Sequence, residues 1–394
     1  MSYLFNSLVG VDELPRIYLD NAAATPPTPQ SLEIYNRYNN WVNPNAIYYP
    51  ATAINKQIER AREQCAKAIN ASSPKQIIFT SCASESNSLV VGSYATVISS
   101  AYEHKSILSY PNVSSNTVTD VQCLSDLLED MNGMLYKANA LVTFMMVQNE
   151  TGEVFPIEKI AETVHKYGLD FHTDASQAFG KIPIDVQKLD VDYMTISSQK
   201  INAPRGCSVL YAKDPSKLTP LIYGTQEMGL RGGTQNVGAI IAMGYAMQDS
   251  VNNLTETVDL YRTLRYEFLR QLTQCFSDEL SLPCITTQRN VPYLIGYTDK
   301  LTGNPSVPNI ILLAFRDKDA ETIVLSASTR GLCISAGSAC DSKVKKIGVS
   351  PAVKRLNFPK EYENGAVRIS FSRATDITDC MRGAEILANT IKDM

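Results

Sequence analysis

The sequence has few of the residues from which metal and disulfide sites are built. Its only three histidines, His104, His165 and His172, lack the spacing of a metal-ligand set. Its nine cysteines are scattered and include no Cys-x-x-Cys pair, which argues against a zinc ribbon and against a disulfide framework. We therefore expect no metal site, and we expect cysteines that stay reduced, as in the cytoplasm.

Long apolar runs and an excess of positive charge are also missing. No stretch has the length of a membrane span, and residues 1–20 contain no basic region followed by an apolar core. We therefore expect neither a membrane segment nor a signal peptide. The net charge of −4 gives no sign of a surface that binds nucleic acid directly. No Gly-x-Gly-x-x-Gly motif follows an expected strand, which discounts a nicotinamide-dependent dehydrogenase.

The sequence does contain an alternation of strand-like and helix-like segments. Short apolar stretches predict buried strands at 76–80, 141–147, 169–172, 192–197 and 207–211. Helical patterns lie between them, for example at 54–69 and 157–167. This alternation predicts an α/β fold with a mainly parallel sheet, in which ligands bind at the carboxyl ends of the strands.

A long run without proline, residues 239–274, favours helix and is suited to connect a large domain to a smaller one. Beyond it, further strands are expected at 309–313, 332–335 and 366–371, followed by a final helix. We expect a large domain over residues 16–260, and a small α+β domain over residues 261–394 together with 1–15.

Two strand ends carry residues suited to cofactor chemistry. Lys200 closes the segment SSQK (197–200), and its amine could form a Schiff base with an aldehyde. Asp174, in HTDASQ (172–177), precedes it by 26 positions and suits a pyridinium nitrogen. The ordinary alternatives are a solvated lysine at a strand end and an Asp that caps a short helix.

Three further segments are candidate parts of a site. In FTSCASESNSL (79–89) a strand runs into a helix, so backbone N–H groups at Ala83 and Ser84 could hold a phosphate. In LRGGTQN (230–236) two glycines beside Thr234 allow a close backbone approach. In SAGSAC (335–340), Cys340 lies among small residues and is expected to be accessible. The alternatives are a Ser-capped helix, a Gly-rich turn and a surface thiol without a role, while Cys82 stays undecided.

Taken together, these segments resemble the cysteine desulfurases of the class V aminotransferase family, which are fold type I enzymes of pyridoxal 5'-phosphate. The resemblance runs from Tyr18 to about Arg373. Besides SSQK, it rests on YLDNAAATP (18–26), IIFTSCASESNSL (77–89), EHK (103–105), QNETG (148–152) and DASQAFGKIPID (174–185). The resemblance implies a seven-stranded, mainly parallel sheet in the large domain.

The same resemblance implies a role for each matched residue. Lys200 would hold the cofactor, Asp174 its ring nitrogen and Gln177 its ring hydroxyl, while His104 would stack on the ring. Other residues expected at the cofactor are Ala83, Ser84, Ser197, Gln199, Asn149 and Thr234. Thr234 would serve the site of a second subunit, which implies a homodimer.

For catalysis, the resemblance is to the group I branch, in which the segment after the reactive cysteine is long. Here 27 residues separate Cys340 from Arg368. Arg368, in VRISFSR (367–373), would bind the carboxylate of L-cysteine together with Asn149. Lys200 would take the α-proton, and His104 would assist proton transfer. The Cys340 thiolate would take the sulfur as a persulfide, leave L-alanine and pass the sulfur to an acceptor protein.

Two departures from the family pattern indicate a specialised branch. Gln199 stands before the lysine where the family usually has His, and Tyr48 stands at another His position, followed by Ala51 in place of Gly. They favour a dedicated pathway such as DNA phosphorothioation. Iron–sulfur assembly, tRNA thiolation, another fold type I aminotransferase and a non-catalytic sulfur-relay scaffold stay open as alternatives.

Overall fold

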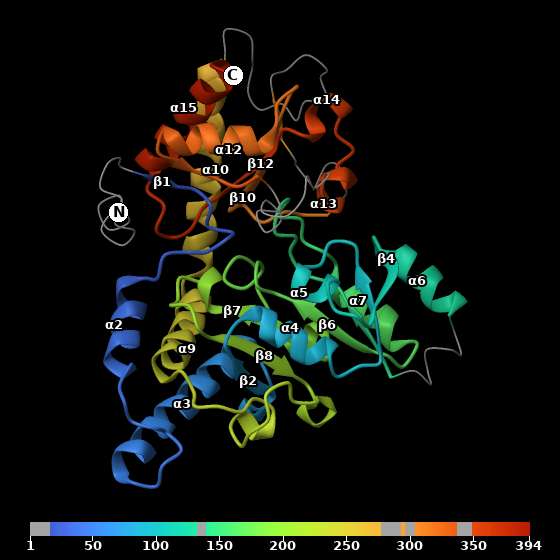
Figure 1. Cartoon of the computed structure of the whole chain (residues 1–394), viewed down its shortest axis with the longest axis vertical. Helices are drawn as coiled ribbons and strands as arrows, with labels where there is room; N and C mark the ends of the chain where they lie inside the picture. The colour runs from blue at the N-terminus through green and yellow to red at the C-terminus, as the bar shows by residue number, and fades with distance from the viewer. Residues whose placement is uncertain (1–15, 132–138, 277–292, 296–303, 337–348) are drawn as a thin grey trace. The chain divides into compact units, whose positions relative to one another are not determined.

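The structure is a computed structural model that describes residues 16–131, 139–276, 293–295, 304–336 and 349–394 (Figure 1). The chain divides into two compact units: unit 1 comprises Met1–Thr25, Gln148–Val154 and Thr255–Met394, and unit 2 comprises Pro26–Val147 and Phe155–Leu254. This division differs from the expected boundaries. Residues 16–25 and 148–154, expected in the large domain, group with unit 1, and the later boundary falls at residue 254 instead of 260.

Unit 2 is built around a seven-stranded sheet with the order β2-β8-β7-β6-β5-β3-β4 (Figure 1). The strands are β2 (Ile77–Thr80), β3 (Thr96–Ser100), β4 (Val113–Val118), β5 (Ala140–Thr143), β6 (Asp170–Asp174), β7 (Tyr193–Ser197) and β8 (Ser208–Ala212). All neighbours pair in parallel except β8, which runs antiparallel to both β2 and β7. The predicted mainly parallel sheet is confirmed.

Helices cover this sheet, which explains why β2, β5, β7 and β8 are buried along their whole length. The helices of unit 2 are α2 (Pro29–Tyr38), which packs on α9, α3 (Tyr49–Ala68), α4 (Ala83–Val91), α5 (Lys105–Leu108), α6 (Val121–Asp130), α7 (Ile157–His165), α8 (Val186–Leu189) and α9 (Val237–Asn252). Short 3₁₀ turns lie at η1 (Pro74–Gln76), η3 (Ser198–Lys200), η4 (Pro215–Lys217) and η5 (Glu227–Gly229). Among the residues that the structure describes, no helix is both long and apolar enough to span a bilayer.

The expected helical run 239–274 consists of two helices, α9 and α10 (Leu254–Phe276). Asn253 ends α9, and its side chain folds back to donate to the Asp249 carbonyl oxygen at 2.9 Å. The expected strand 141–147 is shorter in the structure, where β5 runs from Ala140 to Thr143. Strands β3 and β4 were not predicted, because their polar serines and threonines weaken the apolar pattern.

Unit 1 contains a three-stranded antiparallel sheet, β12-β10-β9, and a short parallel pair, β1-β11. The strands are β1 (Ile17–Tyr18), β9 (Tyr293–Ile295), β10 (Ile310–Phe315), β11 (Leu332–Cys333) and β12 (Ala366–Ser370), and the helices after α10 are α12 (Ala320–Thr329), α13 (Pro351–Arg355), α14 (Lys360–Glu363) and α15 (Ile377–Lys392). Phe268, Leu313, Phe371 and Leu387 belong to one buried core. Strand β1 pairs with β11, so the segment that begins at residue 16 contributes a strand to unit 1, which explains its assignment to that unit.

Candidate active site

The edge of the sheet at which β6 and β7 end carries three of the predicted cofactor residues, Asp174, Ser197 and Lys200. Asp174 is the last residue of β6, and β7 ends at Ser197, directly before the turn η3 that carries Lys200. The two strands are parallel and in register, with Asp174 beside Thr195. Their carboxyl ends therefore lie at one edge of the sheet, where ligands of such folds bind.

Asp174 is held by two hydrogen bonds. Its Oδ2 accepts from Asn87 Nδ2 at 2.9 Å, and its Oδ1 accepts from the backbone N–H of Ser176 at 2.9 Å. Only 6% of Asp174 is exposed. The carboxylate is thus fixed at the strand end, where one oxygen caps the turn that follows and the other accepts from Asn87.

The same asparagine links Asp174 to His104. Asn87 Nδ2 also donates to Ser106 Oγ at 3.0 Å. The Ser106 backbone N–H donates to His104 Nδ1 at 3.1 Å, and the Ser106 hydroxyl lies 2.9 Å from that nitrogen. Nδ1 is therefore an acceptor, so the proton of a neutral His104 is on Nε2.

The ionisable groups around Asp174 have displaced pKa values. Burial lowers the pKa of His104, although part of its side chain is exposed. The charge of Asp174 raises this pKa, and the charges of Lys200 and Lys105 lower it further. Burial lowers the pKa of His172 to about 4, and burial followed by the charge of Asp174 raises the pKa of Glu103 to about 8. His172 lies 2.8 Å from Thr143 Oγ1 through its Nδ1. Near neutral pH both histidines are therefore neutral.

Helix α4 begins beside this network. Its N-cap residue, Cys82, makes no side-chain capping bond, so the alternative of a Ser-capped helix is not what the structure has. Ala83 and the exposed Ser84 form the first turn, and Asn87 lies one turn further along the same helix. The helix therefore directs free backbone N–H groups to one point and the amide of Asn87 to Asp174.

This arrangement fits pyridoxal phosphate. The uncapped start of α4 suits the phosphate, and Asp174 suits the ring nitrogen. Asn87 Oδ1 and Ser176 Oγ are buried and have no hydrogen-bond partner among the residues that the structure describes, so two polar atoms close to Asp174 could still bind a polar group. Two buried polar atoms without partners beside a carboxylate suit a polar ligand better than an apolar one.

The remaining predicted residues of unit 2 lie in the segments that the sequence suggested. Gln177 and Ser197 are buried, at 6% and 4% exposure, and Gln199 is half-buried in the turn before Lys200. Thr234 is exposed, in the loop between η5 and α9. The roles of these four residues at the cofactor therefore stay predictions.

In unit 1, Arg368 lies on β12 and is 3% exposed. Its Nη1 donates to the backbone oxygen of Asn149 at 2.8 Å, and its Nη2 pairs with Asp20 Oδ1 at 2.7 Å. Its Nε is buried without a hydrogen-bond partner among the described residues. Arg368 thus pairs with a carboxylate of its own chain and contacts the backbone of Asn149, the residue with which it is predicted to share the substrate. Cys340 lies outside the described residues.

Sequence reasoning missed three residues that organise these sites: Asn87, Ser106 and Asp20. Asn87 stands four positions after Ala83 and Ser106 two positions after His104, spacings that place each beside its neighbour on a helix start. For Asp20 no local signal exists, because its partner Arg368 is 348 positions away.

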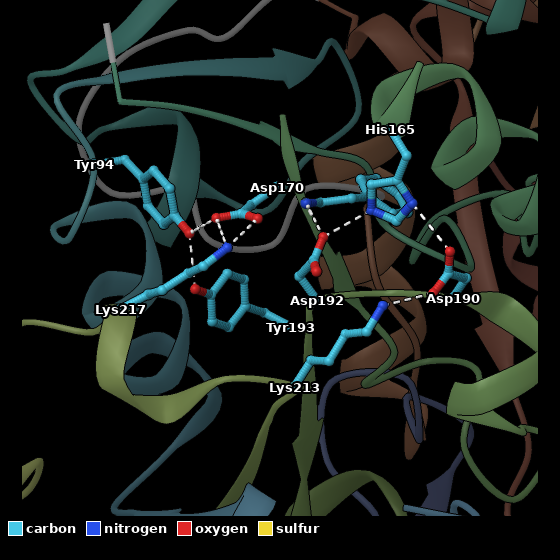
Figure 2. A network of polar contacts seen from close by, with 9 residues as sticks. Tyr94, His165, Asp170, Asp190, Asp192, Tyr193, Lys213 and Lys217 are labelled. Carbon is cyan, nitrogen blue, oxygen red and sulfur yellow. Dashed lines mark hydrogen bonds and ion pairs between the residues drawn. The ribbon is translucent and has the colours of Figure 1, made fainter. Parts of the chain in front are cut away.

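A separate polar network lies at the opposite ends of the strands (Figure 2). His165 Nε2 pairs with Asp192 Oδ2 at 2.8 Å and its Nδ1 with Asp190 Oδ2 at 3.1 Å. Lys217 pairs with Asp170 at 2.7 Å, and Tyr94 donates to the same carboxylate at 2.6 Å. Asp170 is the first residue of β6, so this network fixes the strand at the end remote from Asp174.

The fold and this edge of the sheet define an α/β protein with the residues of a pyridoxal-phosphate site. The sequence profile described as Aminotransferase class-V matches residues 17–382. A cysteine desulfurase of Enterobacter agglomerans is 32% identical, over 92% of this chain and 89% of the relative. The cysteine desulfurase IscS of Dictyoglomus turgidum is 30% identical, over 96% and 95%.

Solved structures agree. A NifS-like protein from Rickettsia africae matches with a TM-score of 0.79 and 26% identity, over 96% of this chain and 100% of that one. A structure titled SspA in complex with cysteine matches with a TM-score of 0.70 and 26% identity, over 90% and 98%. The chain belongs to the class V aminotransferase family, in its cysteine desulfurase branch, whose members depend on pyridoxal phosphate.

Proposed function

We propose that the protein is a cysteine desulfurase that converts L-cysteine to L-alanine and passes the sulfur, as a persulfide on Cys340, to an acceptor protein. The observation that carries this proposal is the hydrogen-bonded chain from Asp174 through Asn87 and Ser106 to His104, at the strand edge that also carries Lys200. The names of the relatives support the choice of substrate.

The residues suited to hold the cofactor fall into groups, each of which would contact a different part of it. Ala83 and Ser84 at the start of α4, with Ser197, would hold the phosphate, and Thr234 would do so from a second subunit. Asp174 would hold the ring nitrogen, and Gln177 and Gln199 the polar edge of the ring. His104 would lie against the ring face. When bound, the cofactor supplies an electron sink for the substrate carbon.

The chain's own residues would carry out the remaining steps. Arg368 and Asn149 would hold the substrate carboxylate, and the Lys200 amine would take the α-proton. The Cys340 thiolate would form an S–S bond as the substrate C–S bond breaks. The electron pair left on the β-carbon takes up a proton, Lys200 would return a proton to the α-carbon to complete alanine, and the sulfur would stay on Cys340 as a persulfide.

The test of this proposal is Lys200→Ala, compared with Lys188→Ala, an exposed lysine of α8. Lys200→Ala should lose the visible absorbance of the bound cofactor and the release of alanine from cysteine. Lys188→Ala should keep both. Alanine release at the wild-type rate by Lys200→Ala would contradict the assignment, and a colourless wild type would favour a non-catalytic scaffold.

A homodimer is the second part of the proposal. Eight of the fifteen exposed large apolar side chains of the described residues fall in two segments of unit 2, 41–49 and 221–228. The Asn45 amide, which donates to Gln235 Oε1 at 3.0 Å, connects the first segment to the loop of Thr234. Apolar surface of this extent suits a protein interface. Trp41, the only tryptophan, is 90% exposed.

Dilution tests the dimer. Sedimentation should show a dimer, and the Trp41 emission should shift to longer wavelength as the dimer dissociates. A monomer at all concentrations would contradict it.

Gln199 and Tyr48 favour DNA phosphorothioation as the downstream pathway over iron–sulfur assembly or tRNA thiolation. The test is to identify the protein that takes labelled sulfur from Cys340. A cytoplasmic location is proposed from the unpaired cysteines.

A further inference from the structure

A second lysine lies directly behind the turn that carries Lys200. Lys181 is only 5% exposed, and its Nζ donates to the backbone oxygen of Lys200 at 2.7 Å. Among the described residues, no carboxylate forms an ion pair with Lys181. A buried ammonium group without a counter-charge is costly, so its retention calls for a reason.

The backbone fixes Lys181 with respect to Asp174. Residues 175–182 form successive tight turns, in which the N–H groups of Phe179 and Lys181 donate to the carbonyl oxygens of Ala175 and Ala178. Gly180 has φ +74°, and a Cβ there would lie 3.3 Å from Ser250, so this turn requires glycine. Lys181 therefore connects the segment that starts at Asp174 with the turn of Lys200.

The two lysines also interact through their charges. Burial, followed by the positive charge of Lys200, lowers the pKa of Lys181 to about 7. Lys200 also acts on His104, whose pKa responds in addition to the charges of Asp174 and Lys105.

We propose, building on the desulfurase function, that Lys181 is a positioning residue for Lys200. Its hydrogen bond fixes the turn of Lys200, and its positive charge favours the uncharged, reactive form of the Lys200 amine. A neighbouring cation is one of the ways in which enzymes keep a lysine nucleophilic. The charge matters most below about pH 7, where Lys181 is protonated.

Three substitutions separate the two contributions. Lys181→Met removes donor and charge, Lys181→Gln keeps a donor without charge, and Lys181→Arg keeps both. Lys188→Met, the same change at an exposed lysine, is the control. For each full-length protein the readout is the fraction of chains that retain the cofactor after borohydride reduction, by intact mass across the pH range. Thermal unfolding reports the fold.

We expect Lys181→Met and Lys181→Gln to need a pH higher by about one unit for half retention, because the cation that opposes protonation of Lys200 is gone. Lys181→Gln should keep more of the thermal stability than Lys181→Met. Lys181→Arg and Lys188→Met should follow the wild type. If Lys181→Met does not fold, Lys181→Gln decides.

Two outcomes would overturn the proposal: a wild-type pH profile for Lys181→Gln, or an equal shift for Lys181→Arg and Lys181→Gln. The second would mean that packing, and not charge, matters. A wild-type chain that retains no cofactor would instead contradict the desulfurase function itself, so the two failures are distinguishable.

Discussion

Asn87 donates one amide hydrogen to Asp174 at 2.9 Å and the other to Ser106 at 3.0 Å. The helix that starts at the expected phosphate position therefore also holds the carboxylate expected at the ring nitrogen. One element, α4, therefore contacts both expected ends of the cofactor site.

Replacing Asn87 by Ala should lower kcat for alanine release by about 10- to 100-fold, because a hydrogen bond to a charged group contributes about 1.5–3 kcal/mol. Asn253→Ala is the matched control, because Asn253 also donates to an aspartate, Asp249, at 2.8 Å but far along the chain. Steady-state kinetics with cofactor occupancy checked by absorbance measures both. An Asn87→Ala enzyme with normal kcat would show that Asp174 needs no support.

Replacing Arg368 by Ala should raise KM for cysteine by at least about 30-fold, because removal of one partner of a desolvated charge pair costs about 2–5 kcal/mol. Arg373→Ala, the second arginine of VRISFSR, should leave KM within about twofold. Initial rates over a range of cysteine concentrations give both values. Equal effects of the two substitutions would mean that the carboxylate is bound elsewhere.

Replacing Cys340 by Ser should abolish the persulfide while the cofactor absorbance still responds to added cysteine. Cys123→Ser, at a partly exposed cysteine of α6, should transfer sulfur normally. Mass spectrometry of peptides after incubation with cysteine locates the persulfide. Its appearance on Cys82, which is exposed at the start of α4, would identify a different sulfur acceptor.

His165 should stabilise the fold in a pH-dependent way. Its hydrogen bond to Asp192, then the charges of Asp192 and Asp190, raise its pKa in the folded state (Figure 2). A raised folded pKa means that the protonated form contributes stability below the unfolded value of about 6.5, and that this is lost as pH rises through the folded pKa.

His165→Gln should therefore destabilise the protein by roughly 0.5–1 kcal/mol more at about pH 5.5 than at about pH 8.5. Urea unfolding at both pH values measures the difference. Lys166→Gln, which breaks the exposed pair with Glu162 at the end of the same helix, should show no such difference. A pH-independent effect of His165→Gln would show that the imidazole contributes only as a neutral donor.

The sequence determined the sheet-forming core and placed the residues expected at the cofactor near strand ends, because both are local patterns. Apolar runs ending two residues before Asp174 and three residues before Lys200 sufficed to predict two strand ends, and parallel pairing then brings them to one edge. The order and spacing of the matched segments also identified the family. Such features are readable because each strand end and its polar residue are adjacent in the chain.

Only the tertiary structure decided which side chains hold those residues in place. Asp20 and Arg368 are 348 positions apart, and Asn87 and Asp174 are 87 apart, so no spacing rule links them. In the sequence nothing distinguishes Lys181 from a surface lysine. Only its burial and its hydrogen bond to the Lys200 backbone connect it with the candidate site. The physical reason is that a hydrogen bond or a desolvated charge depends on the distance between atoms, which the packing of the strands and helices sets and the linear order does not.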